Sequence, residues 1–274
     1  MQEYLERIHY PEMENYRRKF KNSIRWNGID DLDKKVIVVY CEGGYGDVVQ
    51  FCRYFKELKT KGCEVILYCS RPLMRILSKV EGVDGLWDNL DKVPKHDYHV
   101  LSMSLPFLLE EQPVEFPYVK IDNKIEVPKD KLKIGIAWEG NPDHTNNDLR
   151  SCPLKFLKPL WEIKNSQIFM VQKEVKLQTL TEDCQSLELY SSKINDFYDL
   201  AVLINEMDVI VTVDTSVVHI AGALNKPTYL MLSNPEDPRW EVKEWYPNVT
   251  IIRQVRSWGP VVKEIVSRIK KGLN

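Results

Sequence analysis

Hydrophobic positions in the first part of the chain follow the pattern of a buried strand and then an amphipathic helix. Residues 35–40 (KVIVVY) form a mostly β-branched run, which is typical of a parallel strand buried on both faces. A glycine-rich turn follows. Apolar residues then recur at steps of three and four, as on one face of a helix: Val48, Phe51, Cys52, Phe55 and Leu58. This order predicts the first half of a βαβ unit.

The same alternation continues along the chain, with one interruption. Strands are predicted over 64–69, 98–102, 132–138 and 167–171, and helices over 72–79, 154–164 and 198–207. Pro159 should make the helix over 154–164 irregular. Strands that alternate with helices predict parallel sheets. Between 113 and 131 the sequence is rich in proline and charge, so we place an interdomain linker near 120–131.

These patterns divide the chain into three segments. Residues 1–30 are polar and carry tyrosines, with helical spacing at best over 3–21, and are interpreted as an N-terminal arm. Residues 31–128 are predicted to form a first Rossmann-like domain, and residues 129–274 a second. A length of 274 residues suits two domains of roughly 100 to 150 residues each.

The clearest unit lies between residues 208 and 232. A strand (VIVTV) runs into Asp214-Thr215-Ser216, a helix (VVHIAGAL) follows, and a second strand (TYLML) closes the unit. Asn225 stands where a helix C-cap adopts the left-handed conformation. Near the end of the chain, the apolar steps from 261 to 269 predict a terminal amphipathic helix.

Composition excludes several classes of partner. Hydrophobic residues make up 43% and charged residues 28%, with a net charge of -2, as on an ordinary globular surface. Such a balance lacks the positive field that a nucleic-acid partner requires. No apolar run reaches the length of a membrane span and the N-terminus lacks a signal region, so a cytoplasmic protein is expected. Six cysteines without a CxxC pair indicate reduced, mostly buried thiols.

Three polar segments follow predicted strands, where open parallel sheets bind ligands. The first is residues 42–47, in which Gly43, Gly44 and Gly46 let the backbone approach a ligand. Asp47 has two interpretations, a helix cap, which spacing favours, and a general base. The glycines read GGxGD rather than GxGxxG, and residues 69–71 lack the acidic group of a dinucleotide site. Nicotinamide binding is therefore a minority interpretation.

The second segment is a long polar loop over residues 138–153, which includes Trp138 and Asn141. Arg150 in this loop has the chemistry to clamp a phosphate through two hydrogen bonds. A solvated surface arginine explains the sequence equally well. Ser151 is interpreted as a helix cap.

The third segment opens the helix of the clearest unit. This helix is preceded or begun by Asp214, Thr215 and Ser216. The two hydroxyl groups and the free backbone N–H groups at the helix N-terminus suit a diphosphate. His219 lies three and four residues after Ser216 and Thr215, within reach of the same phosphate. A histidine satisfied inside the core is the competing interpretation.

Other chemistries lack their motifs. The five histidines are at positions 9, 96, 99, 144 and 219, and only His96 and His99 lie close together, without a second cluster of ligands. We expect these two to be solvated loop histidines, and no metal site. The chain contains neither GxSxG nor GxxxxGK[ST], which argues against common hydrolases and P-loop enzymes.

Several stretches, in this order, resemble a known family. They read RWNGIDDL, EGGYGDVVQFCRYF, IGIAWEGNPDHTNNDLRSCPL, VQKE and VIVTVDTSVVHIAGALNKPTYLML, followed by Pro235, Arg239-Trp240 and WYP. Together they are similar to GT-B glycosyltransferases related to ADP-heptose heptosyltransferases, and especially to the catalytic part of bacterial tetratricopeptide-repeat glycosyltransferases. The likeness covers most of the chain, although full tetratricopeptide repeats are missing and residues 3–21 retain at most a remnant helix.

The resemblance implies an α/β protein of the GT-B class. Two Rossmann-like parallel-sheet domains would face a cleft, with an N-terminal helical arm and a C-terminal helix. It further implies an inverting, metal-independent hexosyl- or heptosyltransferase that uses a nucleotide-diphosphate-sugar as substrate and no cofactor. The acceptor would be a glycan, a lipid-linked glycan or a protein, held mainly by the first domain. Assembly into a homo-oligomer stays open.

By position, the resemblance also implies roles for single residues. Asp47 corresponds to the catalytic base, and Arg150 to a cation near the donor phosphates, where heptosyltransferases often have lysine. Lys173 is a second cationic candidate, and Glu174 is placed to reach the donor ribose. The remaining nucleotide-sugar-binding positions implied are Gly43, Gly44, Gly46, Trp138, Asn141, Gln172, Asp214, Thr215, Ser216, His219 and Gly222.

Two other functions remain as alternatives. A nucleotide-sugar epimerase also uses paired Rossmann-like domains, and it would convert or release sugar without an acceptor. A non-catalytic nucleotide-sugar-binding or assembly module would keep the fold and lose the acceptor site, since fold does not determine function. Asp47 beside the glycine turn argues against such a module.

Overall fold

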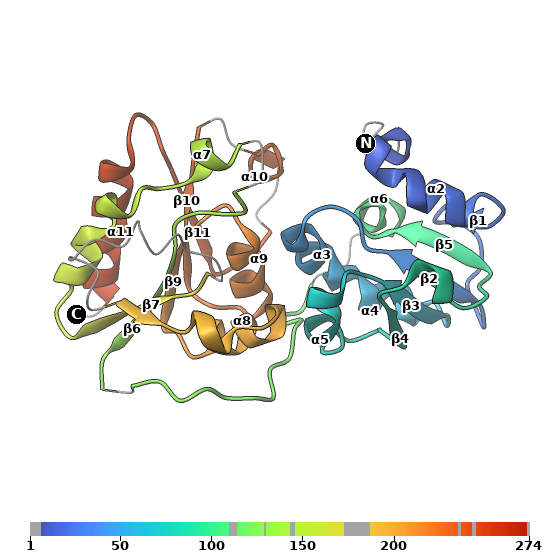
Figure 1. Ribbon diagram of the computed structural model, residues 1–274, viewed down its shortest axis with the longest axis horizontal. Coiled ribbons are helices and arrows are strands. Elements are labelled where there is room, and N and C mark those ends of the chain that lie inside the picture. Colours follow the sequence, from blue (N-terminus) through green and yellow to red (C-terminus); the bar gives the residue numbers. More distant parts are fainter. Residues whose placement is uncertain are drawn as a thin grey trace. The chain divides into compact units, whose positions relative to one another are not determined.

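The computed structural model describes residues 7–109, 114–128, 130–142, 146–172, 187–234, 237–242 and 245–272. The chain divides into two compact units, residues 1–120 and residues 121–274. Each unit is an α/β structure built on one parallel sheet, as Figure 1 shows.

The first unit has five strands in the order β1-β5-β2-β3-β4. They are β1 (Ile24–Arg25), β2 (Val36–Tyr40), β3 (Glu64–Tyr68), β4 (Gly85–Trp87) and β5 (Tyr98–Leu101). The central strand β2 pairs in parallel with β3, Val36 lying opposite Glu64, and with β5 on its other side. Three strands predicted from sequence are confirmed as β2, β3 and β5.

The predicted helix after β2 is confirmed, but it is divided into three short pieces. α3 (Tyr45–Phe51) is followed directly by the 3-10 helix η3 (Cys52–Tyr54) and then by α4 (Phe55–Thr60). Its apolar stripe is buried as the spacing predicts, from Val48 through Phe55 to Leu58. The remaining helices of this unit are η1 (Arg7–His9), η2 (Pro11–Met13), α2 (Glu14–Phe20), η4 (Arg71–Leu73), α5 (Met74–Leu77), η5 (Leu90–Lys92), η6 (Ser102–Ser104) and α6 (Leu105–Leu108).

The segment interpreted as an arm is a packed layer of the first unit. Tyr16 and Phe20 of α2 are buried in one cluster with Val38 and Leu101 of the sheet. β1 then adds a strand beside β5. Aromatic rings bury large apolar areas, so this contact ties the segment to the sheet.

His99 corrects a second expectation, because it is buried and not solvated. Its side chain is 4% exposed, and its ring stacks on Phe20 with 4.5 Å between centroids. Ser23 Oγ lies 3.0 Å from Nδ1 of His99 and 2.8 Å from Nε2 of His96. The pKa of His99 is lowered to about 4, chiefly by burial and in addition by nearby His96 and Arg25.

The second unit has six strands in the order β11-β10-β9-β6-β7-β8. They are β6 (Leu132–Ala137), β7 (Ser166–Met170), β8 (Leu187–Leu189), β9 (Val209–Val213), β10 (Thr228–Leu232) and β11 (Val249–Arg253). All pairings are parallel. The four strands predicted in this half are confirmed as β6, β7, β9 and β10.

Helices of the second unit include α8 (Phe197–Asn205) and α9 (Ser216–Ala223), both near their predicted places. Asn225 has a φ of +58°, and Lys226 N–H donates to the carbonyl of Ala221, which confirms the predicted left-handed C-cap. The others described are α7 (Asn147–Arg150), η7 (Leu154–Phe156), η8 (Lys158–Glu162), η11 (Ser191–Lys193), α10 (Arg239–Val242) and α11 (Trp258–Gly272). The Pro159 region is 3-10 helix, hence irregular as predicted.

One core cluster holds α11 and η8 against this sheet. Ile265 and Val262 of α11 are buried with Leu160 of η8 and with Ile136 and Met170 of the strands. The terminal amphipathic helix is therefore confirmed, with a start three residues earlier than the apolar pattern indicated.

The cysteines agree with a further expectation among the described residues. Cys41, Cys52, Cys63, Cys69 and Cys152 are free thiols, and all but Cys41 are buried. Cys184 lies outside the described residues. No helix in the described ranges is both long and apolar enough to span a membrane.

We predict that His99 makes stability depend on pH between about 6.5 and 4. Its folded pKa of about 4 lies below the usual value of 6.5, so the unfolded chain binds more protons in that window. The stability present above 6.5 is therefore lost as pH falls toward 4. His99→Asn should flatten the plot of melting temperature against pH, measured by circular dichroism at constant ionic strength. Equal slopes in both proteins would contradict this role.

Candidate functional site

Four loops of the second unit leave the carboxyl ends of neighbouring strands. The strands lie in the order β10-β9-β6-β7 and run parallel, so their loops meet at one edge of the sheet. The predicted positions 138–141, 172 and 214–216 directly follow β6, β7 and β9. The fold therefore gathers three separate sequence motifs at the edge where parallel sheets bind ligands.

Gln172 and Trp138 serve the structure of this edge. The Gln172 side chain is buried, and its Oε1 accepts hydrogen bonds from the backbone N–H groups of Trp138 at 2.7 Å and Glu139 at 3.4 Å. The Trp138 ring is 3% exposed and lies in the core cluster under the sheet. Both side chains thus contact protein, whereas Asn141 in the same loop is exposed.

Arg150 is held at this edge and is half-buried, not a solvated surface residue. Its guanidinium lies against Gly140, where an added Cβ would come within 2.9 Å of Cζ. Among the described residues its Nε is buried and has no hydrogen-bond partner. Burial lowers the pKa of Arg150, Asp214 opposes that shift, and Arg239 adds to it. The Arg150 guanidinium is therefore held at the edge of the sheet, and its Nε–H donor has no protein partner among the described residues.

Asp214 follows β9 and stands next to the start of α9. Burial raises its carboxyl pKa, and nearby Arg239 acts in the opposite direction. Thr215 is the N-cap of α9, its Oγ1 accepting from the N–H of Val217 at 3.3 Å. The threonine hydroxyl predicted for a phosphate therefore already caps the helix.

Arg239 is a functional candidate that the sequence reasoning did not single out. It opens α10 after β10, and its Nε lies 3.1 Å from Oδ2 of Asp237. Its positive charge lowers the pKa of both Arg150 and Asp214. The only signal in the sequence was the Arg239-Trp240 pair among the family stretches, to which no role was given.

His219 is a buried, satisfied histidine in this structure, as its competing interpretation stated. Its side chain is 3% exposed, its Nδ1 lies 2.9 Å from the hydroxyl of Tyr246, and Trp240 stacks on its ring at 5.7 Å. Gly222 provides the space, because an added Cβ would lie 2.3 Å from the Tyr246 ring. His219 and Gly222 therefore support the site through aromatic packing.

The glycine turn of the first unit is rigidly bonded. Asp47 Oδ2 accepts the N–H of Gly44 at 2.7 Å, so Asp47 caps α3, and Gly43 has a φ of +86°. The capping interpretation of Asp47 is thus observed, and its side chain is still partly exposed. Glu42 is buried and accepts hydrogen bonds from Ser102 N–H and Oγ, both at 2.9 Å. That bond between two loops was not predicted.

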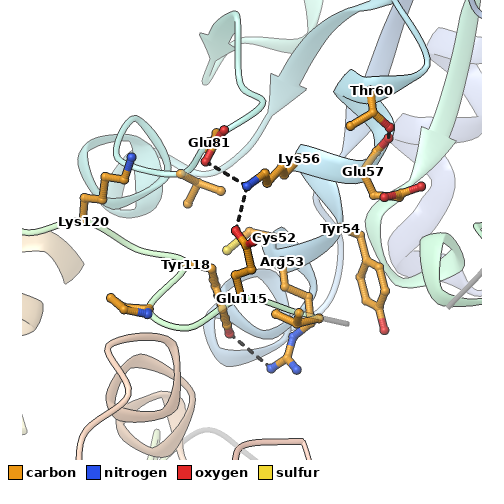
Figure 2. Close-up of a pocket in the computed structure, with 13 residues that line it drawn as sticks. Cys52, Arg53, Tyr54, Lys56, Glu57, Thr60, Glu81, Glu115, Tyr118 and Lys120 are labelled. Atoms are coloured by element: carbon orange, nitrogen blue, oxygen red, sulfur yellow. Dashed lines mark hydrogen bonds and ion pairs between the residues drawn. The ribbon is translucent and has the colours of Figure 1, made fainter. Parts of the chain in front are cut away.

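A separate hollow of about 180 Å³ lies in the first unit, shown in Figure 2. α4 and residues 114–120 supply most of its lining, and Lys56 reaches Glu115 at 2.8 Å and Glu81 at 3.5 Å. None of the predicted site residues lines it. In Figure 2, Lys56 lies between Glu81 and Glu115, and Arg53 donates to the hydroxyl of Tyr118.

Two predicted residues, Lys173 and Glu174, lie outside the described residues. Asp47 and its three glycines belong to the first unit, and the other predicted positions belong to the second. Within the described ranges, no three His, Cys, Asp or Glu side chains gather as metal ligands.

Comparison with known families finds a match within the second unit. Residues 169–268 match the profile of glycosyltransferase family 9 (heptosyltransferase). This match includes Gln172, α9 and α10, whereas Arg150 and Asp47 lie outside it. No curated protein sequence matches the chain.

Solved structures resemble most of the chain, including the residues that match this profile. E. coli ADP-heptose LPS heptosyltransferase II superposes with a TM-score of 0.65 at 13% identity, over 87% of this chain and 99% of that one. TibC of enterotoxigenic E. coli, described as an iron-containing dodecameric glycosyltransferase, gives 0.64 at 10%, over 90% and 78%. E. coli heptosyltransferase WaaC with ADP gives 0.57 at 11%, over 87% and 98%. The predicted GT-B class of fold is confirmed.

We predict that Gly222→Ala destabilises the second unit by about 1–3 kcal/mol, because the new methyl group overlaps the Tyr246 ring. Gly259→Ala is the matched control, since its nearest neighbouring atoms are 4.0 Å away in the first turn of α11. That change should be neutral or stabilise by up to about 1 kcal/mol. Urea denaturation measures both, and similar free energies of unfolding for the two variants would refute the packing role of Gly222.

Proposed function

We propose that the protein is an inverting, metal-independent glycosyltransferase that transfers a sugar from a nucleotide-diphosphate-sugar to an acceptor hydroxyl. The match of residues 169–268 to the family 9 profile and the heptosyltransferase-like fold support sugar transfer. One observation carries the proposal for the donor: Arg150 is built into the carboxyl edge of the second sheet, against Gly140, beside the start of α9. A fixed cation beside a helix N-terminus suits the phosphates of a leaving nucleotide.

The donor nucleotide is assigned to the second unit. WaaC has been solved with ADP, so ADP is the first nucleotide to test. Exposed Asn141 and the backbone around Thr215 and Ser216 line the same edge and complete the proposed donor site. Trp138, Gln172, His219 and Gly222 then act as its supports, through the packing and hydrogen bonds described above.

Asp47 is the proposed base. It takes the proton of the acceptor hydroxyl while that oxygen attacks the anomeric carbon opposite the nucleotide, so configuration inverts in one displacement. Its hydrogen bond from Gly44 supports this role, because a capped side chain is held in one orientation. Arg150 and the N–H groups at the start of α9 meet the charge that develops on the leaving diphosphate.

The first experiment is a thermal-shift screen with ADP-, GDP-, UDP-, CMP- and dTDP-linked sugars. A donor that binds the folded state raises the melting temperature by mass action. A selective shift supports the transferase and names its donor. Sugar conversion without an acceptor would instead indicate the epimerase, and the absence of any shift would favour the non-catalytic module.

We predict that Asp47→Asn lowers turnover by about 100- to 10,000-fold with nearly unchanged donor affinity. Asparagine keeps an acceptor oxygen for the Gly44 N–H, so the start of α3 is preserved. Asp196→Asn is the control: Asp196 caps α8 through the N–H groups of Tyr198 and Asp199 and should leave turnover unchanged. Undiminished turnover in Asp47→Asn would remove Asp47 from the mechanism.

We also predict that transfer continues in excess EDTA. TibC is described as iron-containing, so the assay should compare untreated, EDTA-treated and metal-supplemented protein. Equal rates in all three support charge neutralisation by Arg150 and α9. Activity that disappears with EDTA and returns with one metal would show that the metal-independent part of the proposal is wrong.

A further inference from the structure

We propose that Arg239 is a second diphosphate-binding residue, paired with Arg150 across the end of β9 and held in place by an aromatic clamp. The clamp consists of His219, Trp240 and Tyr246. This inference rests on the proposed function, and it specifies which side chains recognise the two phosphates of the donor.

The sheet order places the two arginines on either side of one strand. Arg150 comes after β6 and Arg239 after β10, and these strands are the two neighbours of β9. Adjacent strands are about 4.8 Å apart, so the two loops start roughly 10 Å from each other. Figure 1 shows α7 and α10, which carry the two arginines, at the same end of the second unit. Two long side chains can converge over such a gap.

One aspartate bonds Arg239, and the charge of a second aspartate acts on both arginines. Asp237 engages Arg239 through Nε, the nitrogen nearest the side-chain stem, which directs the terminal nitrogens. Asp214 lies between the two loops, at the end of β9, and its charge acts on both arginines. A guanidinium has five N–H donors in a planar fork, which matches the oxygens of a phosphate group. Two such forks beside a helix N-terminus match a diphosphate.

The aromatic clamp explains how a short helix presents Arg239 reliably. α10 has four residues, too few to be stable by itself. Trp240 stacks on His219 of α9, with 17° between the rings, and the Tyr246 hydroxyl bonds Nδ1 of His219. The backbone carbonyl of Arg239 accepts from Trp245 Nε1 at 3.0 Å.

The same clamp is tied to the neighbouring strand. Arg253 at the end of β11 donates from Nη2 to the carbonyl of Trp240 at 3.1 Å. The carbonyls of residues 239 and 240 are thus both held by side chains of other segments. Buried His219 is then a positioning residue for α10, and Arg239 is the group that contacts the donor.

Isothermal titration calorimetry of the whole chain with ADP, AMP and inorganic pyrophosphate tests this pairing. Arg239→Gln should weaken ADP and pyrophosphate binding by about 10- to 100-fold, as for a lost charge-assisted hydrogen bond, and should reduce the preference for ADP over AMP. Arg239→Lys keeps the positive charge but lacks the planar guanidinium fork. Its affinity for ADP and pyrophosphate should lie between those of the wild type and Arg239→Gln. Arg268→Gln, on the exposed face of α11, is the control and should bind as the wild type does.

A double-mutant cycle tests the clamp. Tyr246→Phe keeps the ring beside Gly222 but removes the hydroxyl that bonds His219, so ADP binding should weaken several-fold. If the clamp acts through Arg239, the Tyr246→Phe change should have no further effect in the Arg239→Gln background. If Tyr246→Phe weakens ADP binding by the same factor in the wild-type and Arg239→Gln backgrounds, the clamp only stabilises the fold.

The outcomes separate this inference from the proposed function. If wild type binds none of ADP, GDP, UDP, CDP and dTDP, the proposed function fails and the inference with it. If wild type binds ADP, or whichever of these replaces it, and Arg239→Gln with an unchanged melting temperature binds equally well, the inference is overturned and the proposed function stands. If Arg239→Gln does not fold, Arg239→Lys is the deciding variant. If the ratio of its affinities for ADP and AMP equals that of the wild type, the proposal that the Arg239 guanidinium binds the diphosphate is overturned.

Discussion

In a parallel sheet all strands end at the same edge, and this constraint organises the second unit. β10, β9 and β6 are neighbours, so loops separated by almost a hundred residues of chain come together there. Side chains from one loop then satisfy the backbone of the next, as Gln172 does for the N–H groups after β6. The position of Arg150, Asp214 and Arg239 at one edge follows from strand order, and their separation in sequence has no influence on it.

Polar side chains tie loops together in both units. Buried Glu42 holds the turn after β5, buried Gln172 joins the ends of β6 and β7, and partly exposed Asp47 caps α3. A carboxylate or amide inside a protein is costly unless it is hydrogen-bonded, and both buried side chains accept hydrogen bonds from nearby backbone. Such bonds favour one conformation of each loop, which lowers the entropic cost of binding.

The comparisons show how far sequence can change within this fold. Heptosyltransferase II, TibC and WaaC share 13%, 10% and 11% of their residues with the chain, yet each superposes over most of it. The family 9 match is confined to residues 169–268, a stretch that contains the aromatic clamp and α9. Gly222 and Tyr246 illustrate why such positions tolerate little change, because the glycine is the only residue that leaves room for the ring.

The amino-acid sequence by itself determined the central strands, the glycine turn and α9 with its Asn225 cap. These features depend on local patterns: β-branched runs, helical spacing and a left-handed residue at a helix end. The GT-B class was indicated by the resemblance of several stretches to a known family. The four strands that the patterns missed, β1, β4, β8 and β11, are the edges of the two sheets, where partial exposure weakens the hydrophobic signal. Only the tertiary structure decided that residues 7–25 pack into the first unit, that His99 is buried, and that His219 supports α10 beside Arg239. Each of these depends on a contact between segments far apart in the chain, and a pattern read along one segment contains no information about its distant partner.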